Sequence, residues 1–361
     1  MDIGNIANQF QHQVGQQAQT VAPGSFAGQK ITVSDPTSLI LNSAEEASFA
    51  MSEREETRLE ERKMKPKGPS VDRVEQVEKY TQLMDKQGKQ KTLDSFISSL
   101  SKKENLTPRG AMEEAKHFFD DSADAYAALE YARQELGDTL GEALFTEAMD
   151  QLEDVAGPEI KTRLAAGVAA LEHGALGDAE NLKAFYGETL GDLGSPVDIY
   201  DRVIKDYGVD RFEEALAFLT RSLGNDMAAT TINTDRVQLQ GIARDLGTVQ
   251  LLHGLNAQCN TLNARVEKSH GKSGLTSTEL VKEVLKLRDS HFVGAFDIEG
   301  IADKVGMKEI EDRIVFFQDF SSVARDFSEN LFPDSSARLN IIEAIQTALD
   351  DAIAVEDEMY E

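Results

Sequence analysis

The side chains that could ligate a metal ion or transfer protons are scattered along this chain. Its histidines are His12, His117, His173, His253, His270 and His291. No two of them have the i, i+4 spacing that would place a pair of imidazoles on one face of a helix. The sequence therefore predicts no metal site, and no residue pattern in it indicates another cofactor.

Two other patterns fall short of an active site. His117 precedes Asp120 and Asp121, but a surface helix that ends in acidic residues explains this arrangement better than a catalytic group does. The Gly-Lys-Ser segment at 271–273 is similar to the end of a phosphate-binding loop. Val266, however, stands where that loop needs its first glycine, and no predicted strand precedes it. We therefore predict neither nucleotide binding nor catalysis.

Cys259 is the only cysteine. A chain with one cysteine forms no internal disulfide and offers too few thiolates for a structural zinc site, so it suits a reducing cytosol. Cys259 also lies on an apolar helical stripe. This position indicates a buried thiol with a packing role rather than a nucleophile.

Acidic residues dominate the chain after residue 110. Residues 1–110 hold as many basic as acidic side chains, so the net charge of −27 lies in residues 111–361. An acidic body repels phosphate groups and anionic lipid, which argues against nucleic-acid and membrane-surface binding and favours basic protein partners. Solubility alone is an equally good reason for the charge. Adjacent carboxylates such as Glu113-Glu114 are interpreted as solvated faces, not as acid/base pairs.

Neither a Sec signal nor a transmembrane helix is predicted. Residues 1–20 have no basic region followed by an apolar one. Nowhere in the sequence do about 18 apolar residues follow one another, which is the length that a membrane-spanning helix needs.

Residues 1–70 differ in composition from the rest. They are rich in Gln, Ser, Thr and Gly, contain Pro23 and Pro36, and end in the mixed-charge run 53–69. Such a segment buries too little apolar surface to offset its chain entropy, so we predict a disordered arm. One apolar patch interrupts it. The patch suits an extended strand that pairs with a partner, and the alternative is an incidental apolar cluster in a disordered arm. This patch comprises Ile31, Val33, Leu39, Ile40 and Leu41.

From Val71 onward the helical pattern is almost unbroken, and no alternating strand pattern appears. Thr107-Pro108, Ser195-Pro196 and the segment 276–279 have the residue types that begin helices, a hydroxyl cap followed by a proline or an acid. Breaks are predicted at Gly157-Pro158 and within 269–274. The chain is therefore predicted to be all-α, with three helical units at 71–157, 158–272 and 273–361.

The second unit is predicted to end in one long helix. Apolar residues recur at steps of three and four from Leu239 to Val266, which indicates a single buried stripe. Gly241, Gly247 and Gly254 each cost about 1 kcal/mol relative to Ala in a helix, so they indicate a kink or a close approach by another helix.

The third unit has three apolar faces at helical spacing, which we expect to close into one bundle. These faces are Val281, Val284 and Leu285; Ile310, Ile314, Phe317 and Phe320; and Ile341, Ile345, Leu349 and Ile353.

Several of these segments resemble one protein family. Residues 117–133 (HFFDDSADAYAALEYAR) are similar to the central region of the type III secretion gatekeepers, the group of YopN, InvE, MxiC and HrpJ. Residues 289–296 (DSHFVGAF), 313–320 (RIVFFQDF), 331–334 (LFPD) and 343–353 (EAIQTALDDAI) resemble the small TyeA module. That module is a separate chain in some systems and is fused here. The resemblance covers residues 71–361.

The resemblance implies an elongated rod of three helical bundles behind a flexible arm. In the family the arm carries an export signal and a chaperone-binding stretch, for which the patch from Ile31 to Leu41 is the candidate. The body restrains effectors while translocators are secreted first, until host contact or a calcium-type signal releases the block. In the TyeA-like part, Phe292, Val293 and Phe296 are the candidate partner-binding residues.

The resemblance also implies partners and a location. The partners are type III secretion chaperones, export-gate or sorting components, and translocators or their chaperones. The location is the bacterial cytoplasm at the secretion apparatus, through which such a protein can itself be secreted. A general acidic scaffold or adaptor with no role in secretion order is the alternative. An enzyme would need a carboxylate cluster that the sequence does not reveal.

Overall fold

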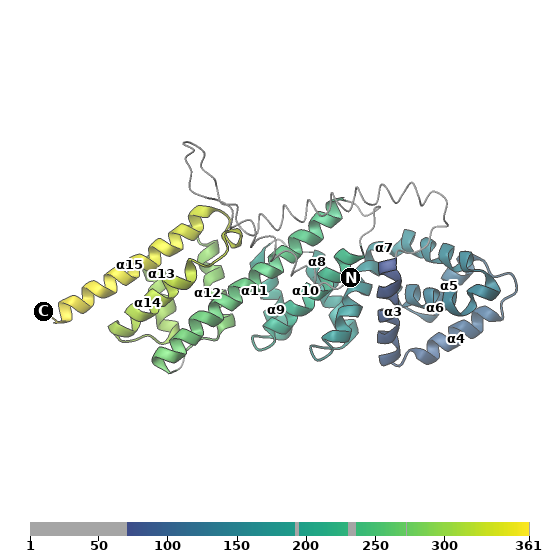
Figure 1. The fold of residues 1–361 in the computed structure, drawn as a ribbon, viewed down its shortest axis with the longest axis horizontal. Coiled ribbons are helices and arrows are strands. Elements are labelled where there is room, and N and C mark those ends of the chain that lie inside the picture. The colour runs from purple at the N-terminus through teal and green to yellow at the C-terminus, as the bar shows by residue number, and fades with distance from the viewer. Residues whose placement is uncertain (1–70, 192–194, 230–235, 272, 361) are drawn as a thin grey trace, which may run out of the picture.

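The computed structural model describes residues 71–191, 195–229, 236–271 and 273–360. Within these ranges the regular elements are thirteen α-helices and one short 3-10 turn, with no strand. The helices are stacked along one axis, from α4, α5 and α6 at one end to the C terminus at the other (Figure 1). The prediction of an elongated all-α fold is confirmed for this part of the chain. The predicted disordered arm, residues 1–70, lies outside the described residues.

Five helices build the amino-terminal end of the rod. Their bounds are α3 (Val71–Lys86), α4 (Gln90–Ser101), α5 (Pro108–Phe118), α6 (Ser122–Leu140) and α7 (Glu142–Glu172). The start of α5 confirms a predicted signal, because the Thr107 side chain accepts a hydrogen bond from the backbone N–H of Gly110. Pro108 takes the first helical position, where a missing N–H costs nothing. Apolar side chains of all five helices form one buried cluster.

Helix α7 does not stop at the predicted break. Gly157-Pro158 lies inside it, and the backbone leaves helical geometry only at Ala156, where φ is −136° and ψ is 19°. The proline ring crowds the preceding turn and has no N–H to donate, which explains a kink here. Beyond the kink, α7 has two buried faces: Leu164 belongs to the amino-terminal cluster and Ala165 to the next one. The domain boundary at 157 therefore falls in a shared helix and stays a prediction.

Four helices continue the rod. They are α8 (Ala179–Gly191), α9 (Pro196–Tyr207), α10 (Phe212–Ala228) and α11 (Arg236–His270). The predicted cap of α9 is confirmed, since Ser195 accepts a hydrogen bond from the backbone N–H of Asp198. The predicted long helix is confirmed as α11. Its buried stripe consists of Ile242, Val249, Leu252, Leu255, Cys259, Leu262 and Val266. No atom lies within 4 Å of a Cβ placed at Gly241, Gly247 or Gly254, so no helix approaches α11 closely there.

The carboxy-terminal end is a bundle of four helices. They are α12 (Ser277–Asp289), α13 (Ala295–Val305), α14 (Ile310–Ala324) and α15 (Ser335–Tyr360), with the 3-10 turn η1 (Glu329–Leu331) before α15. The predicted capping box is present: Thr276 accepts from the Glu279 N–H, and Glu279 accepts from the Thr276 N–H at 2.8 Å. The three predicted faces are buried or half-buried, except that Ile353 is exposed.

The carboxy-terminal bundle shares its core with α8 to α11. Leu262 and Val266 of α11 belong to the same buried cluster as Phe317 of α14. The Tyr200 hydroxyl of α9 also donates a hydrogen bond to the backbone oxygen of Thr278, at 3.0 Å. The predicted boundary at 272 thus separates segments that pack together, and as a domain boundary it stays a prediction.

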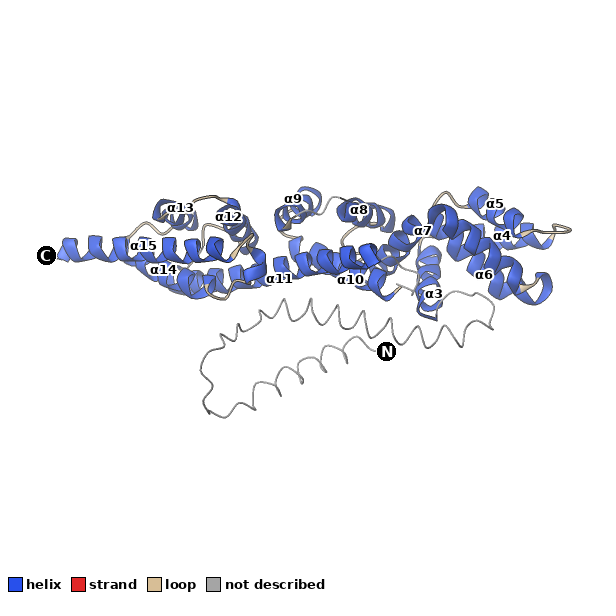
Figure 2. Ribbon diagram, turned by 90° about the horizontal axis from the view of Figure 1, so that it is seen from above, coloured by secondary structure: helices blue, strands red, loops and turns tan. Residues whose placement is uncertain are grey.

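Seen from above, the rod has two rows of helices (Figure 2). Helices α8, α9, α12 and α13 lie in one row, and α10, α11, α14 and α15 lie in the other. Among the described helices, none is both long and apolar enough to cross a membrane.

Candidate functional site

A buried group of charged side chains joins the amino-terminal helices to α8. Lys183 of α8 is fully buried, and its Nζ lies 2.5 Å from Oδ2 of Asp121 and 2.8 Å from the hydroxyl oxygen of Tyr80. Asp121 also caps α6, since its Oδ1 accepts hydrogen bonds from backbone N–H groups of the first turn. Asp124 accepts from the Tyr80 hydroxyl at 2.7 Å and from Lys89 at 2.5 Å.

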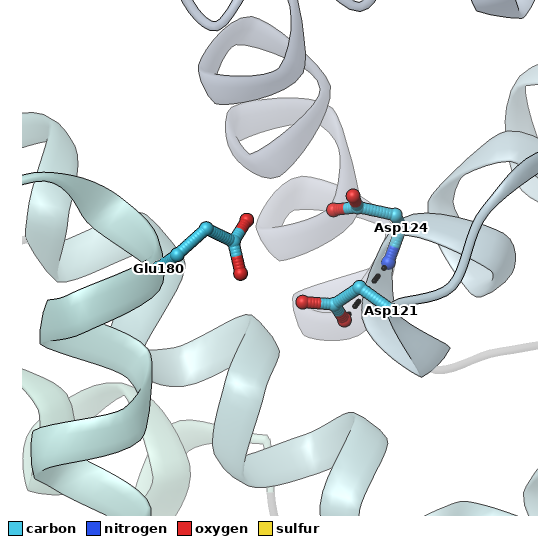
Figure 3. Close-up of side chains that lie close together, drawn as sticks. All are labelled: Asp121, Asp124 and Glu180. Carbon is cyan, nitrogen blue, oxygen red and sulfur yellow. Dashed lines mark hydrogen bonds between the residues drawn. The ribbon is translucent and has the colours of Figure 1, made fainter.

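Arg163 and Glu180 complete this group, which we call the ion network. Arg163 of α7 donates to Oδ2 of Asp121 at 3.0 Å and to Glu180 at 3.5 Å. Glu180 of α8 lies 2.9 Å from Nζ of Lys183 and 3.2 Å from Nζ of Lys89. Glu180 faces the carboxylates of Asp121 and Asp124 from the opposite side (Figure 3). Three acids and three bases therefore neutralise one another at the junction of α3, α6, α7 and α8.

The basic partners favour the ionised forms of Asp121 and Glu180. Burial alone would raise the pKa of Asp121, but the hydrogen bond from Arg163 and the charge of Lys183 outweigh it and hold that pKa well below its usual range. Burial likewise opposes ionisation of Glu180, and Lys183 outweighs it, so the pKa of Glu180 is lowered. Burial and the charge of Asp124 raise the pKa of Tyr80. Its hydroxyl therefore stays protonated and can donate.

The same three carboxylates have the spacing of a cation site. One oxygen from each of Asp121, Asp124 and Glu180 lies within 4.8 Å of the others. Each carboxylate already pairs with at least one of the bases Lys89, Arg163 and Lys183. A divalent cation among them would have to displace these bases or meet their charges at close range. The donor set fits a structural ion network and not a metal centre.

Sequence reasoning missed the ion network. It placed Asp121 at the end of a surface helix, which is wrong because Asp121 caps the start of α6 and is largely buried. The pattern Asp-Ser-Ala-Asp at 121–124 is a capping signal that could have shown this. Lys183 stands beside Leu182 and close to Phe185 in an apolar part of α8, which could have marked it as buried.

Two exposed aromatic side chains mark the connection between α12 and α13. Phe292 is 82% exposed and Phe296 is 83% exposed. The backbone between them is fixed, because Asp297 accepts a hydrogen bond from the Gly294 N–H at 2.9 Å. Val293, predicted with them as a contact residue, instead packs into the core and is not available to a partner. Large exposed apolar groups on an ordered element are typical of interaction sites.

The predicted chaperone-binding residues all lie outside the described residues. They are Ile31, Val33, Leu39, Ile40 and Leu41.

Comparison with known proteins gives two family matches and several structural ones. Residues 39–207 match the HrpJ-like domain, and residues 278–358 match TyeA, so the two together cover well over half of the chain. Methylated MxiC from Shigella flexneri has a TM-score of 0.56 at 16% identity, over 74% of this chain and 95% of that one. CopN from Chlamydia pneumoniae has a TM-score of 0.55 at 16% identity, over 73% of this chain and 94% of that one. The chain belongs to the type III secretion gatekeepers.

In this gatekeeper the two family matches fall at opposite ends of the rod. The HrpJ-like match ends with α9 and holds the whole ion network, whereas the TyeA match takes in α12 to α15 and holds Phe292 and Phe296. A CopN chain from a CopN–Scc3 complex also has this fold, with a TM-score of 0.51 at 16% identity, over 73% of this chain and 94% of that one. Family and fold together indicate a regulatory role in type III secretion.

Proposed function

We propose that this gatekeeper sets the order of export in a bacterial type III secretion system. It acts in the bacterial cytoplasm, at the cytoplasmic face of the secretion apparatus. There it restrains effectors and promotes the secretion of translocators until a host-contact signal arrives. It works by protein–protein contacts, with neither catalysis nor a cofactor.

The observation that carries this proposal is that the TyeA part shares a buried core with α8 to α11. Leu262 of α11 and Phe317 of α14 belong to one cluster, and Arg265 of α11 forms an ion pair with Asp319 of α14 at 3.2 Å. A close-packed interface of this kind transmits displacement rather than absorbing it. A partner that binds the TyeA part can therefore reposition α8 to α11 within a single chain.

Each end of the chain has a proposed contact site. The patch from Ile31 to Leu41 would add a strand to the sheet edge of a secretion chaperone. The existence of a CopN–Scc3 complex supports partner binding by a protein of this fold. Phe292 and Phe296 would anchor an export-gate or sorting component, because two exposed rings on a fixed backbone provide apolar area at little entropic cost.

A deletion strain tests the proposal. Proteins secreted before host contact are compared between the wild-type strain, the deletion strain and the complemented strain. We expect the deletion to release effectors early and to lower translocator secretion, and complementation to restore the order. A deletion strain with unchanged secretion order would favour the alternative, a general acidic adaptor that docks basic partners.

Paired substitutions test the aromatic contact site. Phe292→Ser with Phe296→Ser removes both anchors at little cost in folding free energy, since the side chains are exposed. We expect early effector release from a protein that melts like the wild type. Leu339→Ser, another exposed apolar residue in the TyeA part, is the matched control and should keep the order. If the double variant folds and secretes translocators and effectors in the normal order, Phe292 and Phe296 are not the contact site.

The chaperone patch has an internal control. If residues 31–33 pair as a strand, Ile31 and Val33 point to one face and Thr32 to the other. Ile31→Asp with Val33→Asp should abolish chaperone co-purification, whereas Thr32→Asp should retain it. Unchanged binding by the double variant would contradict the assignment.

A further inference from the structure

The core-facing stripe of α15 continues past the end of the bundle. Its buried members, spaced by three and four residues, are Ile341, Ile345, Ala348 and Ala352. The next positions of the same series are Val355 and Met359, which are 47% and 67% exposed. Helical periodicity places both on the face that is buried earlier in the helix. Helix α15 thus ends in an apolar face that the described part of the chain leaves uncovered.

This end of α15 is ordered and held in place. Figure 1 shows α15 extending beyond the other helices of the bundle to the C terminus. The hydroxyl of Tyr360 donates a hydrogen bond to Glu311, at the start of α14, at 3.1 Å. The face is therefore formed before any partner arrives, so binding would cost little ordering entropy.

The charged residues of α15 beyond Arg338 are all acidic. After Arg338 the sequence contains no Lys or Arg. Its acids are Glu343, Asp350, Asp351, Glu356, Asp357, Glu358 and Glu361. A second copy of the chain would set these acids against one another, and anionic lipid or nucleic acid would be repelled as well. The complementary surface is an apolar groove bordered by Lys and Arg.

We propose that the last two turns of α15 are a docking surface for a basic partner protein. Val355 and Met359 enter an apolar groove of the partner, and Glu356, Asp357 and Glu358 pair with basic side chains at its rim. This is recognition of an amphipathic helix face by a groove. It goes beyond the proposed function, because it assigns a second surface on a different element from Phe292 and Phe296 and does not depend on secretion order.

A synthetic peptide serves as the probe for this surface. The peptide is an amphipathic helix with Leu at the a and d positions and Lys at the flanking positions, and fluorescence anisotropy measures its binding to the full chain. Val355→Ser with Met359→Ser leaves the net charge unchanged. We expect it to weaken binding about ten-fold or more, since burying two such side chains is worth more than 1.4 kcal/mol. Leu339→Ser should bind like the wild type.

Charge-matched variants separate docking from general attraction between opposite charges. Glu356→Gln, Asp357→Asn and Glu358→Gln remove three acids at the proposed rim. Three exposed acids at the other end of the rod are removed in the control, Glu104→Gln, Glu135→Gln and Asp138→Asn. We expect only the first set to weaken binding strongly.

Three results decide the proposal. Slower hydrogen exchange at residues 353–360 in the presence of the peptide would support it. Wild-type binding by Val355→Ser with Met359→Ser, together with equal weakening by the two sets of acid substitutions, would overturn it, because the peptide would then only sense net charge. A dimer in sedimentation velocity that Val355→Ser with Met359→Ser abolishes would also overturn it, since a second copy would then cover the face.

Discussion

The ammonium group of Lys183 lies 2.5 Å from the carboxylate of Asp121, although 62 residues separate them in the chain. Both side chains are buried, so their attraction must offset the cost of taking two charges out of water. The additional hydrogen bonds from Arg163 and to Tyr80 make this possible. The pair holds the start of α6 against α8 and thereby joins the two halves of the HrpJ-like part.

Removing the ammonium group should destabilise this junction. Lys183→Met keeps the length of the side chain but leaves the buried acids short of one cation. We expect a loss of about 3–5 kcal/mol in the free energy of unfolding, measured by urea titration. Lys79→Met is the control, because Lys79 pairs with Glu75 at 2.8 Å on the exposed surface. This substitution should lower the free energy of unfolding by less than about 1 kcal/mol. If Lys183→Met and Lys79→Met lower the free energy of unfolding by the same small amount, the ion network contributes no net stability.

Acid should weaken the same junction. The pKa of Asp121 is lowered from 3.8 in the folded protein, so its ionised form stabilises the fold at pH values above about 3.8. This contribution is lost as the pH falls below that value toward the folded pKa. Asp121→Asn retains a capping side chain but no charge, so we expect lower stability at pH 7 and a smaller loss on acidification.

Urea titrations at neutral pH and below pH 4 check the pH prediction. Asp120→Asn changes the exposed neighbour and should follow the wild-type profile. A profile for Asp121→Asn that also parallels the wild type would show that other groups govern the acid response.

One glycine of α7 is required by the close approach of Tyr80. A Cβ at Gly167 would lie 2.7 Å from Cδ2 of the Tyr80 ring and 3.2 Å from a methyl group of Leu83. Gly167→Ala should therefore cost about 1–3 kcal/mol of stability through overpacking. Gly187→Ala in α8 is the matched control: no atom lies within 4 Å of its Cβ, so the better helix propensity of Ala should stabilise by up to about 1 kcal/mol. In thermal melting we expect Gly167→Ala to lower the melting temperature and Gly187→Ala to raise it.

Features that depend on neighbours in sequence could be predicted, and features that depend on distant contacts could not. The caps at Thr107, Ser195 and Thr276 are i, i+3 relationships, so their residue types suffice to find them. Gly157-Pro158 has the local pattern of a helix end. The helix continues because Leu164 and Ala165, just beyond the pair, are buried in two different clusters.

The predicted partner-binding residues likewise depend on distant contacts that the sequence does not show. Phe292, Val293 and Phe296 are all apolar and close together, and the sequence gives no reason to separate them. Only the packing of the α12–α13 connection directs Val293 into the core and leaves both rings exposed. Lys183 and Asp121 likewise become partners only when α6 and α8 are brought together.

The carboxy-terminal core should respond as one unit with α11. Phe317→Ala and Ile345→Ala create cavities in the shared cluster. We expect Phe317→Ala to lower the free energy of unfolding by about 3–5 kcal/mol and Ile345→Ala to lower it by about 2–5 kcal/mol. Because Leu262 and Val266 line the same cluster, we expect faster hydrogen exchange in the second half of α11 as well as in α12 to α15. Phe292→Ala, the same substitution at an exposed ring, should change stability by less than about 0.5 kcal/mol.

Truncation after residue 272 is the strongest form of this test. It removes α12 to α15, uncovers Leu262 and Val266, and leaves the Tyr200 hydroxyl without the Thr278 oxygen that it contacts. We expect a lower melting temperature than that of the full chain and loss of protection in the second half of α11. If the truncated chain instead melts like the full chain, with α11 protected, the TyeA part is an independent domain that only rests on α11. A signal could then release it without disturbing the remainder of the rod.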